Sequence, residues 1–508
     1  MIQFENVSFA YAGQTSGNLR ELNLTIARGE CVLFCGRSGC GKTTVTRLVN
    51  GLIPYFFAGE LTGRVMVNGL DIARTPMYQI AGKVGSVFQN PRTQFFNVDT
   101  DSEIAFGIEN EALPPGELHR RVHRTAEDLH IGQLLGRNIF ELSGGEKQKI
   151  AFASVYAVNP QVYLLDEPSS NLDMKAIREL KDHLRLIKSQ GKTVLIAEHR
   201  LHYLMDLADR IVYLEEGRVA GIYTPSQLAA LPDDARSLMG LRAVDLNSVH
   251  PVEKRVLTAA PVLTLQDVNL RYKKHTILEN ISLQASRGEI IGVTGHNGTG
   301  KTTFSRALCG LHKDCGGSFF WKGKEAQPKA RRKSAYMVMQ DVNYQLFAEN
   351  VAKECAFGIK APDLSLIEKT LTELGLQGLK ERHPNTLSGG QKQRVAVAVS
   401  MVCGKEVLVF DEPTSGLDYD GMAQVAELLK KLARQGKVIF AVTHDVELIC
   451  QACSRVLYFD AGGVREDLAV TRDNGAKLRG LLFKPLRNSL CRFTNNFKIP
   501  NYRILDNS

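Results

Sequence analysis

Four short motifs occur twice along this chain in the same order, so the fold must contain two copies of one unit. The string L-S-G-G begins at Leu142 and again at Leu387, and two D-E-P strings end at Pro168 and Pro413. Equivalent residues in these motifs lie 245 positions apart, whereas the glycine-rich strings upstream lie 259 positions apart. The second half therefore repeats the first but lacks 14 residues between its glycine-rich string and its L-S-G-G string.

The duplication predicts two domains of ordinary size in the 508 residues, which are too many for one domain. We expect the first domain over residues 1–235 and the second over residues 261–483. Residues 236–260 have little pattern and are predicted to be a linker. The remaining residues, 484–508, form a basic C-terminal tail with five basic side chains and one acidic side chain.

Apolar strand patterns alternate with helical patterns in both units. The first unit has strand patterns at 31–35 and 162–165 and helical patterns at 42–51 and 174–189. This alternation predicts an α/β core with a largely parallel sheet. The segment from about 90 to 155 has more helical character and is expected to form a subdomain on that core.

A string G-x-x-x-x-G-K-T follows an apolar strand pattern and opens a helix in both units. Glycines let backbone N–H groups converge on phosphate oxygens, and the start of a helix favours negative charge. Lys42 and Lys301 would reach the phosphates of a nucleotide, while Thr43 and Thr302 would each place a hydroxyl on Mg²⁺. A glycine-rich turn is the simpler interpretation of one such string, but two strings with partners downstream favour nucleotide binding. The predicted phosphate-binding residues are Gly36, Ser38, Gly39, Gly41, Lys42, Thr43 and Thr44, and Gly295, Asn297, Gly298, Gly300, Lys301, Thr302 and Thr303.

An aspartate and a glutamate follow each other at the end of an apolar strand in both units. Asp166 and Asp411 could hold Mg²⁺ through its water, and Glu167 and Glu412 could accept a proton from an attacking water. An acidic pair between a strand and a loop is common, but four apolar residues before each pair and a proline after it favour the catalytic interpretation.

The string L-S-G-G-[EQ] between a phosphate loop and a D-E-P string resembles the signature of ABC ATPases, over all of the chain except linker and tail. The resemblance implies two tandem P-loop domains, each a mainly parallel sheet core with an antiparallel β part and a helical subdomain. In that family the signature of one domain caps the ATP held by the other. Two composite sites are therefore expected, one from Lys42 with Ser388 and one from Lys301 with Ser143. The signature glycines are Gly144, Gly145, Gly389 and Gly390.

The same resemblance implies contacts with adenine and with the metal. Tyr11 and Tyr272 match the aromatic residue that stacks on adenine. Gln89 and Gln340 match the Q-loop glutamine, which contacts the metal, senses nucleotide and touches the membrane partner.

Two further pairs follow the D-E-P strings. Asp173 and Asp418 close the D-loops of the family. His199 and His444 match the switch histidine that contacts the terminal phosphate, and we expect them to act with the two catalytic glutamates.

The segments after the Q-loop glutamines indicate a branch of the family. They read Q-F-F and then A-F-G in the first unit, and Q-L-F and then A-F-G in the second. This pattern is similar to the ATPases of energy-coupling factor importers, which take up vitamins and transition-metal ions. Phe95, Phe96, Leu346 and Phe347 are the candidates for the docking surface, with ordinary core packing as the alternative for each. Arg92 and Asn343 stand where the family often has aspartate, which affects the polar contacts of docking.

The resemblance implies that ATP and Mg²⁺ are the cofactors. It implies two partners, an integral-membrane coupling subunit and a substrate-binding membrane subunit. The net charge of +9 is a mild bias that suits an anionic membrane surface and does not indicate nucleic-acid binding. Because no apolar run of about 18 residues and no signal-peptide pattern occur, we expect a cytoplasmic protein. The resemblance implies that it is peripheral, at the cytoplasmic face of the membrane. A sugar-type importer ATPase, or a soluble tandem ABC protein acting on ribosomes or nucleic acid, remains the alternative.

Overall fold

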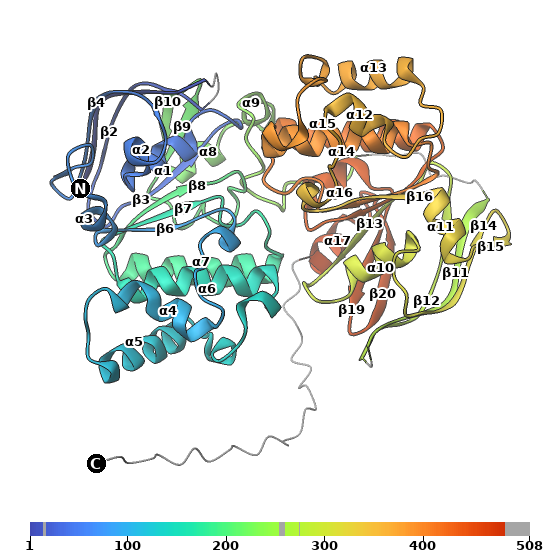
Figure 1. Cartoon of the computed structure of the whole chain (residues 1–508), viewed down its shortest axis with the longest axis horizontal. Helices are drawn as coiled ribbons and strands as arrows, with labels where there is room; N and C mark the ends of the chain where they lie inside the picture. The colour runs from blue at the N-terminus through green and yellow to red at the C-terminus, as the bar shows by residue number, and fades with distance from the viewer. Residues whose placement is uncertain (14–16, 253–259, 274, 483–508) are drawn as a thin grey trace, which may run out of the picture.

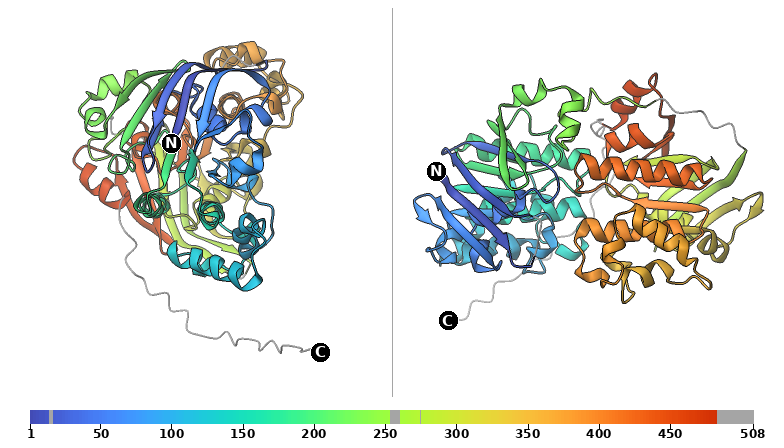
Figure 2. Two further views of the ribbon diagram at one scale, coloured as in Figure 1. Left: turned by 90° about the vertical axis from the view of Figure 1, so that its left-hand side faces the viewer. Right: turned by 90° about the horizontal axis from the view of Figure 1, so that it is seen from above.

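The computed structural model describes residues 1–13, 17–252, 260–273 and 275–482. Part of the predicted linker and the whole basic tail lie outside these residues. The described chain forms two halves that lie side by side, as Figures 1 and 2 show. Each half contains one four-stranded sheet and one six-stranded sheet, so the duplication seen in the sequence is a duplication of the fold.

The four-stranded sheets are antiparallel throughout. Their strand orders are β2-β1-β4-β5 and β12-β11-β14-β15. Side chains alternate between buried and exposed along β2 because one face of the sheet packs on the core and the other faces solvent. The strands are β1 (Ile2–Tyr11), β2 (Leu19–Ile26), β4 (Gly59–Val67), β5 (Leu70–Asp71), β11 (Pro261–Tyr272), β12 (His275–Ser286), β14 (Cys315–Trp321) and β15 (Lys324–Glu325).

The six-stranded sheets are parallel except for one antiparallel edge strand each, β10 and β20. Their orders are β10-β9-β3-β8-β7-β6 and β16-β17-β18-β13-β19-β20. The central strands are buried on both faces, which explains their continuous apolar sequences. The strands are β3 (Cys31–Cys35), β6 (Val84–Val87), β7 (Val162–Asp166), β8 (Thr193–Ala197), β9 (Arg210–Glu215), β10 (Arg218–Tyr223), β13 (Ile290–Gly295), β16 (Ala335–Val338), β17 (Val407–Asp411), β18 (Val438–Val442), β19 (Arg455–Asp460) and β20 (Gly463–Ala469).

Helices cover these sheets and confirm the α/β prediction. The first half has α1 (Lys42–Val49), α2 (Leu52–Tyr55), α3 (Met77–Ala81), α4 (Thr100–Glu109), α5 (Pro115–Asp128), α6 (Gly144–Val158), α7 (Met174–Ser189), α8 (Pro225–Ala229) and α9 (Asp233–Leu238). The second half has α10 (Lys301–Leu308), α11 (Pro328–Ser334), α12 (Val351–Ala356), α13 (Leu364–Glu373), α14 (Gly389–Val402), α15 (Tyr419–Arg434), α16 (Val446–Ala452) and α17 (Gly475–Leu482).

The two halves pack head to tail, with their helical subdomains at opposite ends of the molecule. In Figure 1 the helical subdomain of the first half, with α4 and α5, lies at the bottom, and that of the second half, with α12 and α13, lies at the top. This head-to-tail arrangement brings the loops at one end of each parallel sheet toward the other half. Within the part of the chain that the structure describes, no helix is long and apolar enough to cross a membrane.

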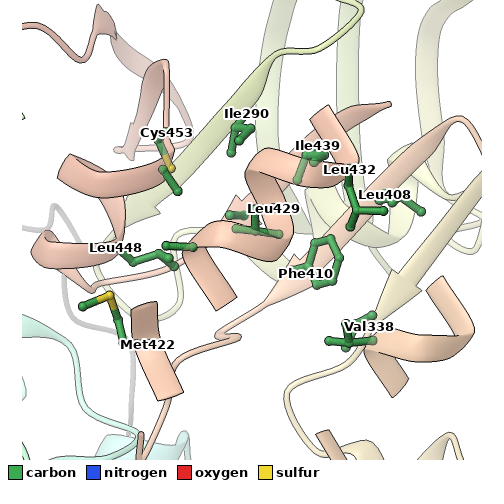
Figure 3. Close-up of a cluster of buried hydrophobic side chains, with 14 of the residues drawn as sticks. Ile290, Val338, Leu408, Phe410, Met422, Leu429, Leu432, Ile439, Leu448 and Cys453 are labelled. Atoms are coloured by element: carbon green, nitrogen blue, oxygen red, sulfur yellow. The ribbon is translucent and has the colours of Figure 1, made fainter. Parts of the chain in front are cut away.

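The apolar core of each half lies between the six-stranded sheet and its covering helices. Figure 3 shows part of the second core, where Phe410 of β17 and Ile439 of β18 face Leu429 and Leu432 of α15. Residues from the predicted linker join both cores. Leu241 packs in the first core and Leu246 in the second, so this part of the linker is fixed to both halves.

Candidate functional site

The first glycine-rich string forms a tight loop between β3 and the start of α1. Gly36, Gly39 and Gly41 have φ values of 141°, 79° and 107°, which L side chains rarely adopt. A Cβ atom on Gly36 would lie 2.2 Å from the carbonyl oxygen of Leu214, so the loop has no room for a side chain there. The loop thereby leaves backbone N–H groups at a helix N-terminus, which suits a phosphate.

Lys42 lies in the first turn of α1 and folds back over this loop. Its ammonium group donates to the carbonyl oxygens of Gly36 and Arg37, both at 3.0 Å. Lys301 does the same in the second half, at 2.6 Å from Gly295 O and 2.9 Å from His296 O. The positive charge of each lysine is thus held at the mouth of a phosphate loop.

The second loop has the same backbone as the first. Gly295, Gly298 and Gly300 have φ values of 140°, 84° and 93°, and α10 begins at Lys301. A Cβ atom on Gly295 would lie 2.2 Å from the carbonyl oxygen of Phe459. Both loops therefore have the shape that the sequence predicts. The remaining loop residues, Thr44 and Thr303, follow the metal-site threonines on α1 and α10.

A threonine hydroxyl and an aspartate carboxylate meet at the predicted metal position in each half. Thr43 Oγ1 donates to Asp166 Oδ1 at 3.2 Å, and Thr302 Oγ1 donates to Asp411 Oδ2 at 3.2 Å. Burial, with a contribution from the neighbouring Glu167 charge, raises the pKa of Asp166 to about 7, and burial also raises the pKa of Asp411. A desolvated carboxylate beside a hydroxyl fits a hard cation such as Mg²⁺, which would offset the buried negative charge.

The predicted general bases lie directly after these aspartates. Glu167 and Glu412 have positive φ values of 45° and 48°, which are uncommon for residues with a side chain. His199 Nε2 lies 3.4 Å from Glu167 Oε1, and His444 Nε2 lies 3.5 Å from Glu412 Oε1. The structure therefore brings each glutamate and histidine together. Burial raises the pKa of Glu412 to about 7, which suits a group that accepts a proton near neutral pH.

The Q-loop glutamines differ between the halves. Gln89 Nε2 donates to Glu167 Oε2 of its own half at 2.5 Å. Gln340 Nε2 donates instead to Asn171 Oδ1 of the other half at 3.1 Å. The position equivalent to Asn171 is Gly416, where an added Cβ atom would lie 3.2 Å from both Gln89 Nε2 and Glu167 Oε2. The two sites are thus built from the same motifs but with different contacts.

The D-loop aspartates connect each half to the phosphate loop of the other. Asp418 Oδ2 accepts a hydrogen bond from the backbone N–H of Ser38 at 2.6 Å. Asp173 Oδ2 accepts one from the backbone N–H of Asn297 at 2.7 Å. Each aspartate also caps the helix that follows it, α15 or α7, which fixes its direction. Both phosphate loops are therefore completed by a residue from the opposite half.

The signature serines occupy the N-caps of α6 and α14. Ser143 forms a capping box with Glu146, and Ser388 forms one with Gln391. Both serines are exposed, as are the glycines Gly144, Gly389 and Gly390, whereas Gly145 is buried in the same helix start as Gly144. No described hydrogen bond joins either serine to the opposite phosphate loop, so the pairings Lys42–Ser388 and Lys301–Ser143 stay predictions.

The two aromatic residues expected to stack on adenine have different surroundings. Tyr272 is 61% exposed, whereas Tyr11 is 8% exposed and packs edge-on against Phe9 and Phe57. The Tyr11 hydroxyl lies 3.2 Å from Thr44 Oγ1. The ring of Tyr272 is exposed, with Lys273 Nζ 5.9 Å from its centroid, while that of Tyr11 faces other side chains, so stacking stays a prediction for both.

Sequence reasoning missed three arginines that lie where the halves meet, Arg37, Arg200 and Arg242. Arg37 stands in the first phosphate loop and forms an ion pair with Asp420 at the start of α15. Aligning the two copies residue by residue could have pointed to Arg200 and Arg242, because the second copy has Asp445 at the position equivalent to Arg200.

The fold and the two loops define a P-loop protein with two tandem nucleotide-binding domains. The sequence profile described as "ABC transporter" matches residues 19–170 and 278–415. The chain belongs to the ABC transporter family. One relative is a protein of Treponema denticola, provisionally described as an ABC transporter ATP-binding protein, with 48% identity over 94% of this chain and 99% of its own. A protein of Methanosarcina mazei with the same description is 31% identical over 92% of this chain and 88% of its own.

Solved structures share the fold at low sequence identity. An RNase-L inhibitor aligns with a TM-score of 0.65 and 23% identity, covering 94% of this chain and 93% of its own. A complex that contains an archaeal ribosome recycling factor aligns with a TM-score of 0.64 and 22% identity, covering 91% of this chain and 90% of its own. These alignments confirm the tandem arrangement of two domains. Membership of the ABC family implies that the chain binds and hydrolyses ATP.

Proposed function

We propose that this chain is the ATP-binding and ATP-hydrolysing subunit of an energy-coupling factor importer for vitamins or transition-metal ions. It would act at the cytoplasmic face of the membrane with an integral-membrane coupling subunit and a substrate-binding membrane subunit. The observation that carries the proposal is an exposed aromatic pair beside each Q-loop. Phe96 and Phe347 are 75% and 71% exposed, and the phenylalanines of the A-F-G strings, Phe106 and Phe357, are 39% and 65% exposed.

A buried glutamate holds each aromatic segment in place. Glu103 Oε2 accepts from the backbone N–H of Phe96 at 3.0 Å and of Asn97 at 2.8 Å. Glu354 Oε2 accepts from Phe347 N–H at 2.7 Å in the same way. The glutamate that opens each E-x-A-F-G string therefore fixes the segment whose aromatic ring is exposed, and a contiguous exposed apolar patch marks a docking surface.

The two rings of the first half form one apolar surface. Phe96 and Phe106 stack with their centroids 4.9 Å apart. Two of the predicted docking residues behave differently. Leu346 is 4% exposed and belongs to the core, so its assignment to the docking surface is wrong, and Phe95 packs partly against the first core. Of the four predicted docking residues, Phe96 and Phe347 are the two whose side chains are exposed.

The Q-loop links this surface to the nucleotide site. Gln94 Oε1 accepts from the backbone N–H of Phe88 at 3.3 Å, and Gln345 Oε1 accepts from the backbone N–H of Met339 at 2.9 Å. In each half this second glutamine therefore bridges the loop that carries the Q-loop glutamine. A movement of the aromatic surface would therefore shift Gln89 relative to Glu167. This connection supports coupling between a membrane partner and hydrolysis.

At each site the chain's own residues would bind and orient the reactants. MgATP supplies the phosphoryl group whose transfer to water releases the energy. The phosphate loop and its lysine would hold the phosphates, the threonine–aspartate pair would hold the metal, and the glutamate after that aspartate would accept the proton of the attacking water. The switch histidine beside that glutamate would orient the terminal phosphate.

Charged substitutions test the docking surface. Phe96→Asp and Phe347→Asp should leave ATP binding intact and strongly reduce co-purification with the membrane partners. Tyr78→Asp is a matched control, because Tyr78 is 74% exposed but lies on α3. The proposal fails if the two phenylalanine variants associate with membranes as well as the control does. Co-sedimentation of the wild-type chain with ribosomes instead of membranes would favour the ribosome-acting alternative.

A further inference from the structure

The two copies differ most sharply just after their switch histidines. The first half reads E-H-R-L-H from residue 198 to 202, and the second reads T-H-D-V-E from residue 443 to 447. Arg200 and His202 of the first half thus correspond to Asp445 and Glu447 of the second. An arginine and a histidine in one copy are replaced by two acidic residues in the other, and all four side chains lie close to the contact between the halves.

In the first half, Arg200 supports the D-loop of its own half. Its guanidinium donates to the carbonyl oxygens of Ser169 and Leu172, both at 3.3 Å. Leu172 directly precedes Asp173, which contacts the second phosphate loop. The arginine therefore holds the backbone beside the residue that crosses to the other half.

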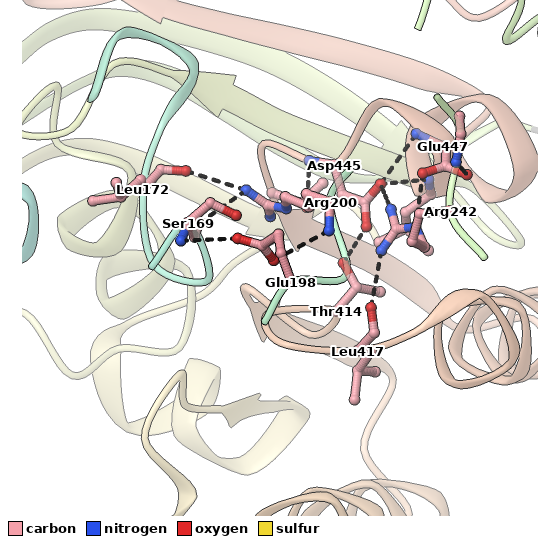
Figure 4. Close-up of polar contacts among 12 residues, drawn as sticks. Ser169, Leu172, Glu198, Arg200, Arg242, Thr414, Leu417, Asp445 and Glu447 are labelled. Carbon is pink, nitrogen blue, oxygen red and sulfur yellow. Dashed lines mark hydrogen bonds and ion pairs between the residues drawn. The ribbon is translucent and has the colours of Figure 1, made fainter. Parts of the chain in front are cut away.

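In the second half this support comes from the linker. Arg242 donates to Leu417 O at 3.3 Å, and Leu417 is the residue equivalent to Leu172. The same guanidinium donates to Asp445 Oδ1 at 2.6 Å and Glu447 Oε2 at 2.7 Å. Figure 4 shows the two arginines side by side, each reaching the D-loop of a different half. Arg242 thus supports the D-loop of the second half as Arg200 supports that of the first.

Residues 238–242, which we call the strap, hold Asp418 from both sides. Gly240 O accepts from the backbone N–H of Tyr419 at 3.2 Å, while Arg242 holds the carbonyl of Leu417. Asp418 lies between these two residues and reaches Ser38 N–H in the first phosphate loop at 2.6 Å. The strap thereby fixes the direction of Asp418, which completes the nucleotide site of the first phosphate loop and Glu167. We call this the first site and the site of the second phosphate loop and Glu412 the second site.

The strap also touches the first phosphate loop directly. Arg37 donates to Leu238 O at 2.5 Å. Gly240 has a φ of 72°, and a Cβ atom there would lie 2.6 Å from Arg37 Cγ, so the two segments are in close contact. The backbone N–H of Ala243 donates to Glu447 Oε1 at 3.1 Å. These contacts leave the strap little freedom to move away from the site.

We propose that Arg242 is a positioning residue for the first nucleotide site, because it holds the second D-loop so that Asp418 meets Ser38. Arg242 does not contact the phosphate loop itself. The second site depends instead on Arg200, which lies in the half that supplies Asp173. Loss of the Arg242 contacts should therefore impair the first site far more than the second. The inference rests on the proposal that both sites hydrolyse ATP.

The test measures each site separately in the full chain. Glu412→Gln leaves the first site as the hydrolytic one, and Glu167→Gln leaves the second. Arg242→Lys keeps the charge but loses the fork that reaches three oxygens at once. We expect single-turnover hydrolysis to fall at least about tenfold in the Glu412→Gln background and by less than about twofold in the other. Equal losses in both backgrounds, or no loss in either, would overturn the proposal.

A second variant places an arginine at position 445, which is equivalent to position 200 of the first half. Arg242→Ala combined with Asp445→Arg and Glu447→His recreates the pattern of residues 200 and 202 and leaves no unpaired buried acid. It should restore first-site hydrolysis to within about threefold of the parent background. A folded relocation variant whose first site is at least about tenfold slower than the parent background would overturn the proposal, and this outcome can be read even if Arg242→Lys fails to fold.

If the proposed function is wrong, hydrolysis by the two parent backgrounds will show it before any change is made at Arg242. A parent background without any turnover would show that one site is not hydrolytic. The comparison would then use the affinity of each site for a fluorescent ATP analogue, with Lys42→Ala or Lys301→Ala removing the other site. Weaker binding confined to the first site supports the role of Arg242, and unchanged or equally weakened binding refutes it.

Discussion

Replacing Arg242 with methionine should destabilise the second half by about 3–5 kcal/mol at pH 8, which is the usual cost of breaking a buried ion pair. The side chains of Arg242, Asp445 and Glu447 are 3%, 1% and 9% exposed, so water cannot take over the lost interactions. A matched control is Arg185→Met. Arg185 also bridges two carboxylates, those of Asp182 and Asp206, but all three side chains are at least half exposed, and its loss should cost less than about 1 kcal/mol.

The cost should depend on pH in a defined direction. Burial alone would raise the pKa of Asp445, but Arg242 and Arg200 lower it below its ordinary value. The stability that this carboxylate contributes is therefore present above the pKa of an unfolded aspartate, about 4, and is lost as the pH falls through its lowered folded value. Without Arg242, burial should dominate and raise the folded pKa, so acidification should relieve the defect in the variant. The difference between wild type and variant should be largest near pH 8 and shrink toward pH 5.

Urea denaturation followed by tryptophan fluorescence measures this cost. The chain has one tryptophan, Trp321 on β14, so the signal reports on the second half. A loss below about 1 kcal/mol at pH 8, or a loss that grows on acidification, would refute the reasoning.

Three further outcomes follow from the site. Glu167→Gln and Glu412→Gln should each keep nucleotide binding and reduce hydrolysis at their own site by about 10²-fold or more in single-turnover assays; near-normal rates would exclude them as bases. Gly416→Asn should slow the first site, because its φ of 69° and the nearby Gln89 Nε2 and Glu167 Oε2 leave a side chain strained; unchanged turnover would contradict this. Asn171→Gly should free Gln340 from its contact across the halves and change the metal dependence of the second site only, as Mg²⁺ titrations of hydrolysis would show.

Much of the fold followed from the sequence because its signals are local. The strand pattern at 31–35 and the helical pattern at 174–189 coincide with β3 and α7, and the segment predicted to be helical contains α4, α5 and α6. The phosphate loops were predictable for the same reason, since their glycine spacing and the helix that follows are a continuous stretch of chain.

Contacts between distant segments were harder to predict. Arg242 lies in a stretch without periodicity, and its partners are about 200 positions away, so no pattern in one segment indicates the contact. The charge reversal between Arg200 and Asp445 was the available signal, but it requires the two copies to be compared residue by residue. Leu346 shows a second limit of sequence reasoning, because an apolar residue in a docking motif looks the same in sequence whether it faces the core or a partner.

The central claim is that each half holds one MgATP, completed by the other half. Equilibrium binding of MgATP to the Glu167→Gln/Glu412→Gln protein tests it most directly, because slow hydrolysis lets the bound nucleotide be counted. We predict two MgATP per chain in this protein and one after Lys42→Ala or Lys301→Ala is added. A single MgATP per chain before either lysine is changed would contradict the account.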